Sequence, residues 1–309
     1  MAPPKTYSSI SAFHSKLLGA KRILAVCGAG LSASSGLPTF RGKGGMWRNH
    51  EAMSLATLDA FERDPGLVWM FYGYRRHMAL TVKPNAAHYA LAELARKVPG
   101  FMCLTQNVDN LHIRASHPPS QLKLLHGSLF SIKCTRCSFL QPSNADDPFC
   151  PALAPASLPP PPNQPHPILD PNTPLPSVPA QDLPHCPKCQ IGLQRPGVVW
   201  FGEQLDHQML EDIDKWIEAE KVDLVLVIGT SGVVWPAAGF SEQARTKGET
   251  SVVVVNMELE EGGRNNRPEK EDFGFEGDAA VLLPRLLEPI IGRMVVEEEG
   301  EVRWVGGRS

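Results

Sequence analysis

Four of the seven cysteines form two Cys-x-x-Cys pairs, Cys134 with Cys137 and Cys186 with Cys189. Each such turn can bring two thiolates onto one tetrahedral zinc ion, and two turns close the shell without leaving a position for water. Residues 138–185 separate the pairs, a longer gap than in most zinc ribbons, but the cost of closing a loop grows slowly with its length. The pattern therefore predicts one structural zinc ion bound by these four cysteines.

The other three cysteines do not continue this pattern. Cys27 and Cys103 lie in apolar stretches, where core packing is the default for a cysteine. Cys150 lies between the two pairs, and we do not expect it to be a ligand.

A glycine turn at Gly28-Ala29-Gly30 follows the apolar run 22–27 and precedes a helical stretch. This context lets backbone amides face a pyrophosphate at a helix N-terminus. A hydride-transferring dehydrogenase would carry an acidic residue at the end of the next strand. Glu51 has about that spacing, but no strand leads to it, so we expect a dinucleotide to bind in another way.

A second glycine turn, at residues 229–231, follows the apolar run 224–228, and Asn256 ends a third run with Glu258 close behind. Open α/β sheets bind ligands at the carboxyl ends of their strands, so Asn256 and Glu258 are candidates for holding a ribose. For either residue taken alone, simple solvation of a loop explains the sequence equally well.

His126 ends the predicted strand 122–126. An imidazole that titrates near neutral pH can take a proton from a hydroxyl at working pH, which makes His126 a candidate general base. The alternative is a hydrogen-bonded structural histidine. Without further context, that alternative is the favoured interpretation of a single histidine at the end of a strand. The same structural interpretation applies to His88, His112 and His117.

The surrounding pattern alternates strands with helices, which argues for a doubly wound α/β sheet. Continuous apolar runs such as 224–228 are typical of parallel strands covered on both faces. Residues 54–80 are helical with a break near Asp64-Pro65. The other predicted strands are 101–105 and 252–255, and the other predicted helices are 85–97, 205–219 and 237–246.

Residues 138–185 interrupt this alternation, because fifteen of them are proline. Proline fixes φ and lacks a backbone donor, so neither a helix nor a sheet continues through such a segment. We expect a mobile insertion, partly polyproline II, whose composition cannot build a core. A docking site for a proline-recognition module is the less favoured alternative.

The two ends of the chain are expected to be peripheral. Ile10, Phe13 and Leu17 recur at helical spacing behind Ser8 or Ser9, which predicts an N-terminal helix. The alternative is a mitochondrial transit segment, because no acidic residue precedes Glu51.

Composition narrows the class of protein. With 42% hydrophobic and 20% charged residues the chain is an ordinary globular one, and a net charge of −3 offers no basic field for nucleic acid. The uncharged run 224–241 is broken by glycine and proline and makes a poor membrane span. No secretory leader is present, so we expect an intracellular protein, either mitochondrial or cytosolic and nuclear.

Taken in order, these pieces resemble the sirtuin family over about residues 20–290. The motifs are Gly28-Ala29-Gly30-Leu31-Ser32, Gly36-x-Pro38-x-Phe40-Arg41, Thr105-Gln106-Asn107-Val108-Asp109, Leu125-His126-Gly127, the paired Cys-x-x-Cys turns, Val199-Trp200-Phe201-Gly202-Glu203, Gly229-Thr230-Ser231 and Asn256. Phe71-Tyr72-Gly73-Tyr74-Arg75-Arg76 and Leu55-Ala56-Thr57 are similar to the class III, desuccinylase-like branch.

The resemblance implies a Rossmann-like NAD-binding domain with a smaller zinc-bearing domain. The large domain would comprise residues 21–130 and 192–292, with a helical module at about 42–84. The zinc module would span 131–191 with the insertion 138–185 inside it. An N-terminal helix at 1–20 and a tail at 293–309 complete the expected division.

The resemblance also implies roles for single residues. The expected catalytic residues are His126, Asn107 and Asp109, and Gln106 would line the nicotinamide pocket with the last two. The remaining expected NAD-binding residues are Gly28, Ala29, Gly30, Ser32, Phe40, Arg41, Gly229, Thr230, Ser231, Asn256, Glu258 and Ala279. The expected substrate-binding residues are Tyr72, Arg75, Ala52, Ala56, Val199, Trp200 and Phe201, and residues 199–203 would pair with the substrate backbone as an added strand.

The implied activity is NAD-dependent removal of acyl groups from protein lysines, which yields nicotinamide and O-acyl-ADP-ribose. Tyr72 and Arg75 lie three residues apart, so on a helix they share a face and could bind an acidic acyl group such as succinyl, malonyl or glutaryl. An exposed pair on an amphipathic helix is the alternative. General deacetylation, mono-ADP-ribosyl transfer and a catalytically inactive NAD or ADP-ribose sensor are the competing functions. Acylated protein lysines are the expected partners of a chain that acts as a monomer.

Overall fold

The computed structural model describes residues 8–39, 45–159, 166–246, 248–259, 272–297 and 301–308. Its largest sheet has six strands in the order β11-β10-β9-β1-β4-β5, and every neighbouring pair is parallel. The strands are β1 (Arg22–Cys27), β4 (Gly100–Thr105), β5 (Leu122–Leu124), β9 (Leu224–Ile228), β10 (Ser251–Asn256) and β11 (Phe273–Glu276).

The strand order places a topological switch point between β1 and β9. From β1 the chain builds outward through β4 and β5, and it then returns to build outward on the other side through β9, β10 and β11. Loops leaving the carboxyl ends of β1 and β9 therefore diverge, which opens the crevice where such sheets bind dinucleotides. The predicted doubly wound α/β fold is confirmed.

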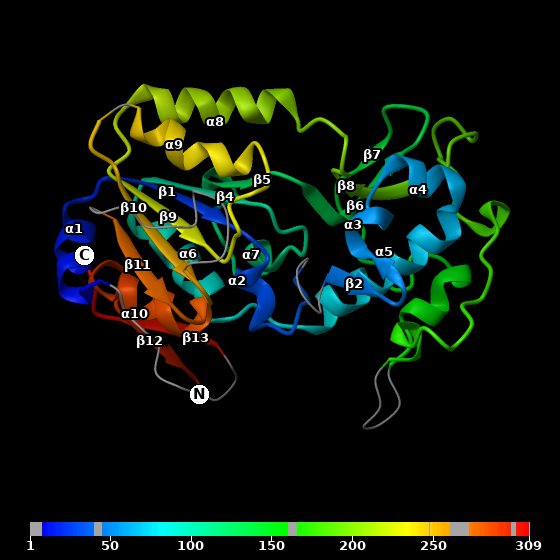
Figure 1. The fold of residues 1–309 in the computed structure, drawn as a ribbon, viewed down its shortest axis with the longest axis horizontal. Helices are drawn as coiled ribbons and strands as arrows, with labels where there is room; N and C mark the ends of the chain where they lie inside the picture. The colour runs from blue at the N-terminus through cyan, green and yellow to red at the C-terminus, as the bar shows by residue number, and fades with distance from the viewer. Residues whose placement is uncertain are drawn as a thin grey trace.

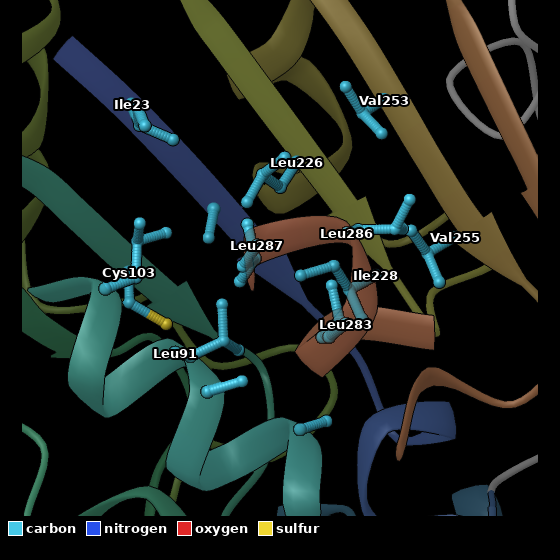
Figure 2. Packing of buried hydrophobic residues seen from close by; sticks show 14 of the residues in the cluster. Ile23, Leu91, Cys103, Leu226, Ile228, Val253, Val255, Leu283, Leu286 and Leu287 are labelled. Atoms are coloured by element: carbon cyan, nitrogen blue, oxygen red, sulfur yellow. The ribbon is translucent and has the colours of Figure 1, made fainter. Parts of the chain in front are cut away.

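Helices cover both faces of this sheet (Figure 1). On one face lie α1 (Ile10–Gly19), α6 (Ala86–Lys97) and α10 (Ala279–Ile291), and on the other lie α8 (His207–Ala219) and α9 (Phe240–Arg245). Alternate residues of β1 supply the two cores, Ile23 and Ala25 on the first face and Leu24 and Val26 on the second. Figure 2 shows the first core, where leucines of α10 pack against the strands.

A smaller unit stands beside the sheet (Figure 1). It contains α4 (Leu58–Arg63), α5 (Pro65–Thr81) and a three-stranded sheet in the order β7-β6-β8, with β6 (Gly127–Cys134), β7 (Leu140–Gln141) and β8 (Gln194–Val198). The predicted break in the helical stretch is present. Asp64 caps α5 by accepting a hydrogen bond from the Leu67 backbone N–H at 2.8 Å, and Pro65 occupies the first turn, where its missing N–H costs nothing.

The proline-rich insertion is packed, so the prediction that its composition cannot build a core is wrong. Its described residues form three short 3-10 helices, η3 (Pro151–Ala156), η4 (Pro167–Leu169) and η5 (Ala180–Asp182). Prolines begin η3 and η4, where a missing donor is harmless, and the apolar residues between the prolines turn toward α5. Leu153, Ala156, Ile168 and Leu183 are all at most 4% exposed and join the core of the small unit.

Other predicted elements agree with the structure to within a few residues, including α1 behind its Ser9 cap and α6 behind its Asn85 cap. The sequence did not predict β6, β8, β11 or the antiparallel pair β12 (Arg293–Val296) and β13 (Val302–Val305). No helix within the described ranges is long and apolar enough to cross a membrane. The remaining elements are α2 (Gly30–Ala33), β2 (Met46–Trp47), β3 (His50–Glu51), α3 (Ala52–Leu55), α7 (Leu111–Arg114), η2 (Pro119–Gln121) and η6 (Ala237–Gly239).

Candidate active site

The two glycine turns at the switch point touch each other. The Gly30 backbone N–H donates to the Gly229 carbonyl at 2.8 Å, and a Cβ built on Gly28 would lie 2.6 Å from the Thr230 Cβ. Gly229 has φ +57°, and a Cβ there would lie 2.4 Å from the Leu31 backbone nitrogen. Side chains at these positions would force the loops apart, so glycine is required for this close approach.

A cavity of about 300 Å³ opens beside these turns. Of the residues expected to bind NAD, Gly30, Gly229, Asn256 and Ala279 line it, and the exposed Glu258 does not. Ser34 and Asp278 were not predicted from the sequence. Their side chains hydrogen-bond at the cavity wall, and Asp278 also caps α10. The lining residues are Gly30, Ala33, Ser34, Gly229, Val255, Asn256, Met257, Gly277, Asp278 and Ala279.

A buried polar network lies behind the first turn. The Ser32 hydroxyl donates to Asp109 Oδ2 at 2.7 Å, and Asn107 Nδ2 donates to the Gly28 carbonyl at 3.0 Å and to the Ser32 hydroxyl at 3.2 Å. Burial raises the pKa of Asp109, and the hydrogen bonds from Ser32 and the Leu111 backbone oppose that rise. The network joins the loop after β1 to the loop after β4.

Gln106, in the loop after β4, connects this network to the loop after β9. Its Nε2 donates to Thr230 Oγ1 at 3.0 Å, while its backbone carbonyl contacts Nδ1 of His126 at 3.1 Å. Asn256 adds a further link, because its Nδ2 donates to the Thr230 carbonyl at 3.1 Å. The polar residues predicted from three separate motifs therefore meet at one edge of the sheet.

His126 lies between β5 and β6, half-buried, at the point where the large and small units meet. A carbonyl can only accept, so its contact with Gln106 fixes the proton on Nδ1 and leaves Nε2 as a free acceptor. Burial lowers the pKa of His126, which keeps the imidazole neutral at pH 7. The ring is therefore prepared to accept a proton at Nε2.

The other central histidines are buried: His88 and His117 are hydrogen-bonded, as the structural interpretation expects, whereas the His112 ring has no hydrogen-bond partner among the described residues. His88 Nδ1 accepts from the Asn85 backbone N–H at 3.3 Å in the capping box of α6. His112 and His117 are 1% and 4% exposed, with ring centroids 5.7 Å apart.

Tyr72 and Arg75 lie on α5 but are not the exposed pair that we considered as an alternative. Tyr72 is 3% exposed, and its pKa rises to about 12, mainly through burial. Burial also lowers the pKa of Arg75, while the nearby Tyr72 and Asp109 favour its charged form. Arg75 thus lies within electrostatic reach of the polar network around Asp109.

Ala52 and Ala56 are buried in the same core as Tyr72 and Trp200. The Phe201 backbone N–H donates to the Ala56 carbonyl at 2.9 Å, and the Val199 N–H donates to the His126 carbonyl at 2.9 Å. The segment 199–201 therefore runs from the candidate base to the small residues.

Arg195 holds this segment in place. Its guanidinium makes a two-point contact with Glu203 at 2.7 and 2.8 Å and lies 3.6 Å from the ring centroid of Trp200. Glu203 Oε2 also accepts from the Trp200 backbone N–H at 2.8 Å. The sequence did not reveal the role of Arg195, because its partner lies eight residues away in a stretch with no regular period.

The four predicted zinc ligands converge. All their sulfur atoms lie within 4.8 Å of one another, with Cys134 and Cys189 3.6 Å apart and Cys137 and Cys186 3.7 Å apart. Tetrahedral zinc–sulfur bonds of about 2.3 Å place sulfurs about 3.8 Å apart, so the cluster fits a zinc ion. Backbone N–H groups of Gly192 and Ile191 lower the pKa of Cys189 to about 6, which favours the thiolate. Cys150 stands outside the cluster.

Two expected NAD-binding residues, Phe40 and Arg41, lie outside the described residues. Ala29 and Ser231 are half-buried in the two glycine turns, and Thr230 is buried between them. Apart from Glu258, the expected residues that the structure describes thus gather around the switch point and the junction with the small unit.

A Rossmann-type sheet beside a smaller unit (Figure 1) that carries four converging cysteines defines a known class of protein, and comparisons with known proteins agree. Residues 28–236 match the Sir2 family. The chain is 43% identical to an NAD-dependent protein deacylase of Candida albicans over 91% of this chain and 97% of that one. It is 42% identical to the mitochondrial NAD-dependent protein deacylase sirtuin-5 of Canis lupus familiaris over 94% and 87% of the two chains.

Solved structures show the same likeness. The crystal structure of a Sir2 homologue in complex with NAD is 32% identical, with a TM-score of 0.71 over 90% of this chain and 92% of that one. A Sir2 variant with a deacetylated p53 peptide and 3′-O-acetyl ADP-ribose is 25% identical, with a TM-score of 0.67 over 91% and 98%. The chain belongs to the Sir2 family.

Proposed function

We propose that the chain removes acyl groups from protein lysines with consumption of NAD, and that it acts best on acidic acyl groups. The observation that carries the reaction is the single unprotonated nitrogen of His126 beside the polar network of Ser32, Asn107 and Asp109. The printed names of the C. albicans and dog relatives support the same activity.

NAD supplies a ribose–nicotinamide bond that can break and a ribose hydroxyl that can accept the acyl group. The crowded turns at Gly28, Gly30 and Gly229 would bring backbone close to a pyrophosphate, and Asn256, which ends β10 and lines the cavity, would hold the adenosine ribose. Gln106, Asn107 and Asp109 would position the nicotinamide amide, because amide and carboxyl groups can pair with both its donor and its acceptor.

His126 would take the ribose hydroxyl proton at Nε2 while Gln106 holds the ring through Nδ1. A neutral imidazole is required for this step, and the lowered pKa provides it at pH 7. Residues 199–203 would hold the substrate backbone as an added strand beside the tunnel for the acyl-lysine.

The test is incubation of the protein with NAD and an acylated peptide, followed by measurement of nicotinamide release and peptide mass loss. His126→Ala should lower kcat/KM by about 10²–10⁴-fold while the melting temperature is retained. In the wild type, the acid limb of kcat/KM should lie below pH 6.5, since the pKa of His126 is lowered. Near-normal turnover of His126→Ala would show that another group takes the proton.

The same assay separates the competing functions. A mass gain on protein would indicate mono-ADP-ribosyl transfer, and tight NAD binding without turnover would indicate a sensor. The sensor is disfavoured because Ser32, Asn107 and Asp109 form a complete hydrogen-bond network at the predicted position.

The acidic-acyl specificity is supported by the buried Tyr72 and by the half-buried Arg75 one turn further along α5. A guanidinium offers two parallel donors to a carboxylate, and a phenol kept neutral by its raised pKa adds a third. Ala52 and Ala56, in the same core cluster as Tyr72, would leave more room for a long acyl chain than a bulkier pair. A methyl group would gain little from such a pair, so acetyl-lysine should be the poorer substrate.

Arg75→Met tests the specificity. It should lower kcat/KM for succinyl-lysine by about 10- to 100-fold, the value of one charge-assisted contact, while sparing or raising deacetylation. Tyr72→Phe is the matched milder variant, because it removes only the hydroxyl. An equal loss for both substrates in Arg75→Met, or equal wild-type efficiency on acetyl and succinyl peptides, would leave a general deacetylase.

Three further expectations stay predictions. They are the stated domain boundaries, the monomeric state and the compartment, mitochondrial or cytosolic and nuclear. The dog relative is named as mitochondrial, which favours the first compartment.

A further inference from the structure

A second group of metal-binding side chains lies inside the large unit, away from the four-cysteine cluster. Cys27, Cys103 and His112 place one ligand atom each within 4.8 Å of one another, and all three residues are buried. We propose that they form a binding site for a thiophilic metal ion, Cu(I) or Zn(II).

The strand register explains why the two thiols meet without forming a disulfide. Cys27 pairs with Thr105, and Cys103 pairs with Ala25, so the two cysteines are offset by two residues on adjacent parallel strands. With a rise of about 3.3 Å per residue and a spacing of about 4.8 Å, their Cα atoms should lie about 8 Å apart. That exceeds the roughly 7 Å that a disulfide can span.

The sulfur atoms nevertheless lie 3.8 Å apart. Two sulfurs bound at about 2.3 Å to one tetrahedral ion are separated by about 3.8 Å. The distance also matches those within the zinc cluster, 3.6 and 3.7 Å. An ion between the strands would therefore meet two ligands at ordinary bond lengths without moving the backbone.

His112 supplies the independent reason to expect a ligand. His112 is the second residue of α7 and is only 1% exposed. Neither of its ring nitrogens has a hydrogen-bond partner in the part of the chain that the structure describes. A buried polar group without a partner destabilises the fold, and neutral imidazole is a common metal ligand. Metal coordination would satisfy one of the two orphaned nitrogens.

The surroundings suit a soft ion and exclude a hard one. Both cysteines face the core shared with α6 and α10, and Figure 2 shows the Cys103 sulfur among aliphatic side chains such as Leu91. Thiolate and imidazole select copper and zinc over magnesium or calcium. Binding releases the protons of both thiols. Three ligands suit Cu(I), while two thiolates neutralise Zn(II), so the two ions need separate experiments.

The experiment uses reduced, zinc-replete protein, titrated in one arm with Cu(I) against a coloured copper chelator and in the other with Zn(II) against a zinc chelator. One tight equivalent beyond the structural zinc is expected in at least one arm. Because the site is buried, samples are held for hours before each reading. X-ray absorption at the bound metal should show two sulfur ligands and one nitrogen.

Cys27→Val and Cys103→Val should each abolish the added equivalent, and His112→Gln should weaken it at least tenfold. Cys150→Val is the matched control, a buried cysteine outside the group, and should keep it. Loading should raise the melting temperature of the wild type and of Cys150→Val, raise that of His112→Gln less, and leave that of the Cys27 and Cys103 variants unchanged. Zinc content and circular dichroism of every variant establish that the fold and the four-cysteine cluster are intact. No added equivalent in either arm, or one that survives in the Cys27→Val, Cys103→Val double variant, would overturn the site.

Discussion

The two units of this protein reach a buried core by different means. In the large unit, helices cover both faces of the six-stranded sheet, and mainly aliphatic residues fill the two cores. The small unit has a three-stranded sheet, and its core is rich in aromatic residues such as Trp69, Phe71 and Trp200. Four cysteines and a proline-rich insertion complete it. The large unit is stabilised by a regular sheet covered by helices, and the small unit is stabilised by contacts between particular side chains.

The difference matters for the active site, which takes its parts from both units. The polar groups at the strand ends belong to the large unit, and the candidate acyl-binding residues belong to the small unit. Damage to the small unit should therefore change acyl binding and overall stability first, while damage at the strand ends should change chemistry.

The largest expected effect is the loss of the zinc site. Structural zinc in small modules contributes on the order of 10 kcal/mol, and a sheet of only three strands offers little to replace it. Cys186→Ala should lose the metal, lower the melting temperature and abolish turnover. Metal analysis, thermal denaturation and the deacylation assay together check this.

The matched control is Cys150→Ala, because Cys150 is buried nearby but lies outside the cluster. It should keep one zinc ion per chain and most of its stability. Full activity in a wild-type sample freed of zinc would contradict a structural role for the ion.

The sequence predicted the large unit well, for a physical reason. Strands 22–27 and 224–228 occur at the predicted bounds. A short, continuous apolar run that ends at a glycine turn is typical of a parallel strand buried on both faces of the sheet. The prediction of a parallel sheet also implies that Gly28, Asn107 and Asn256 lie close together, because the carboxyl ends of parallel strands lie at the same edge of the sheet. β11 was missed because Phe273–Glu276 is short and contains a glycine.

The small unit was harder to predict, because its contacts are long-range and have no period. No sequence pattern indicates that Arg76 of α5 donates hydrogen bonds to the insertion. The same is true of the ion pair between Arg195 and Glu203. High proline content was interpreted as loss of structure, whereas the segment forms 3-10 turns against α5 and needs no ladder of its own.

The second prediction tests that contact between α5 and the insertion. Arg76 is 1% exposed and donates to the Leu129, Asn144 and Asp146 carbonyls. Arg76→Met would leave the carbonyls of the buried Leu129 and Asn144 without this donor, which should cost about 3 kcal/mol or more. Denaturant unfolding measures the loss, and the exposed Arg63→Met on α4 should change stability by less than about 0.5 kcal/mol.

A small change in Arg76→Met would mean that the insertion adds little to the small unit. The original expectation of a dispensable loop would then hold despite the packing. A large loss with zinc still bound would show that the insertion stabilises α5 independently of the metal.

The smallest expected effect belongs to the large unit and depends on pH. Burial lowers the pKa of His88 to about 3 and that of His117 to about 4. The unfolded chain binds protons on these rings below about pH 6.5, whereas the folded chain does not until the lowered pKa is reached. Stability should therefore be full above pH 6.5 and fall as the pH drops, by about 1.4 kcal/mol per pH unit for each histidine. His117→Asn should flatten the fall between pH 6.5 and 5, which denaturant unfolding at a series of pH values measures. Parallel curves for wild type and His117→Asn would show that the ring is protonated in the folded state and that the large unit tolerates a buried charge there.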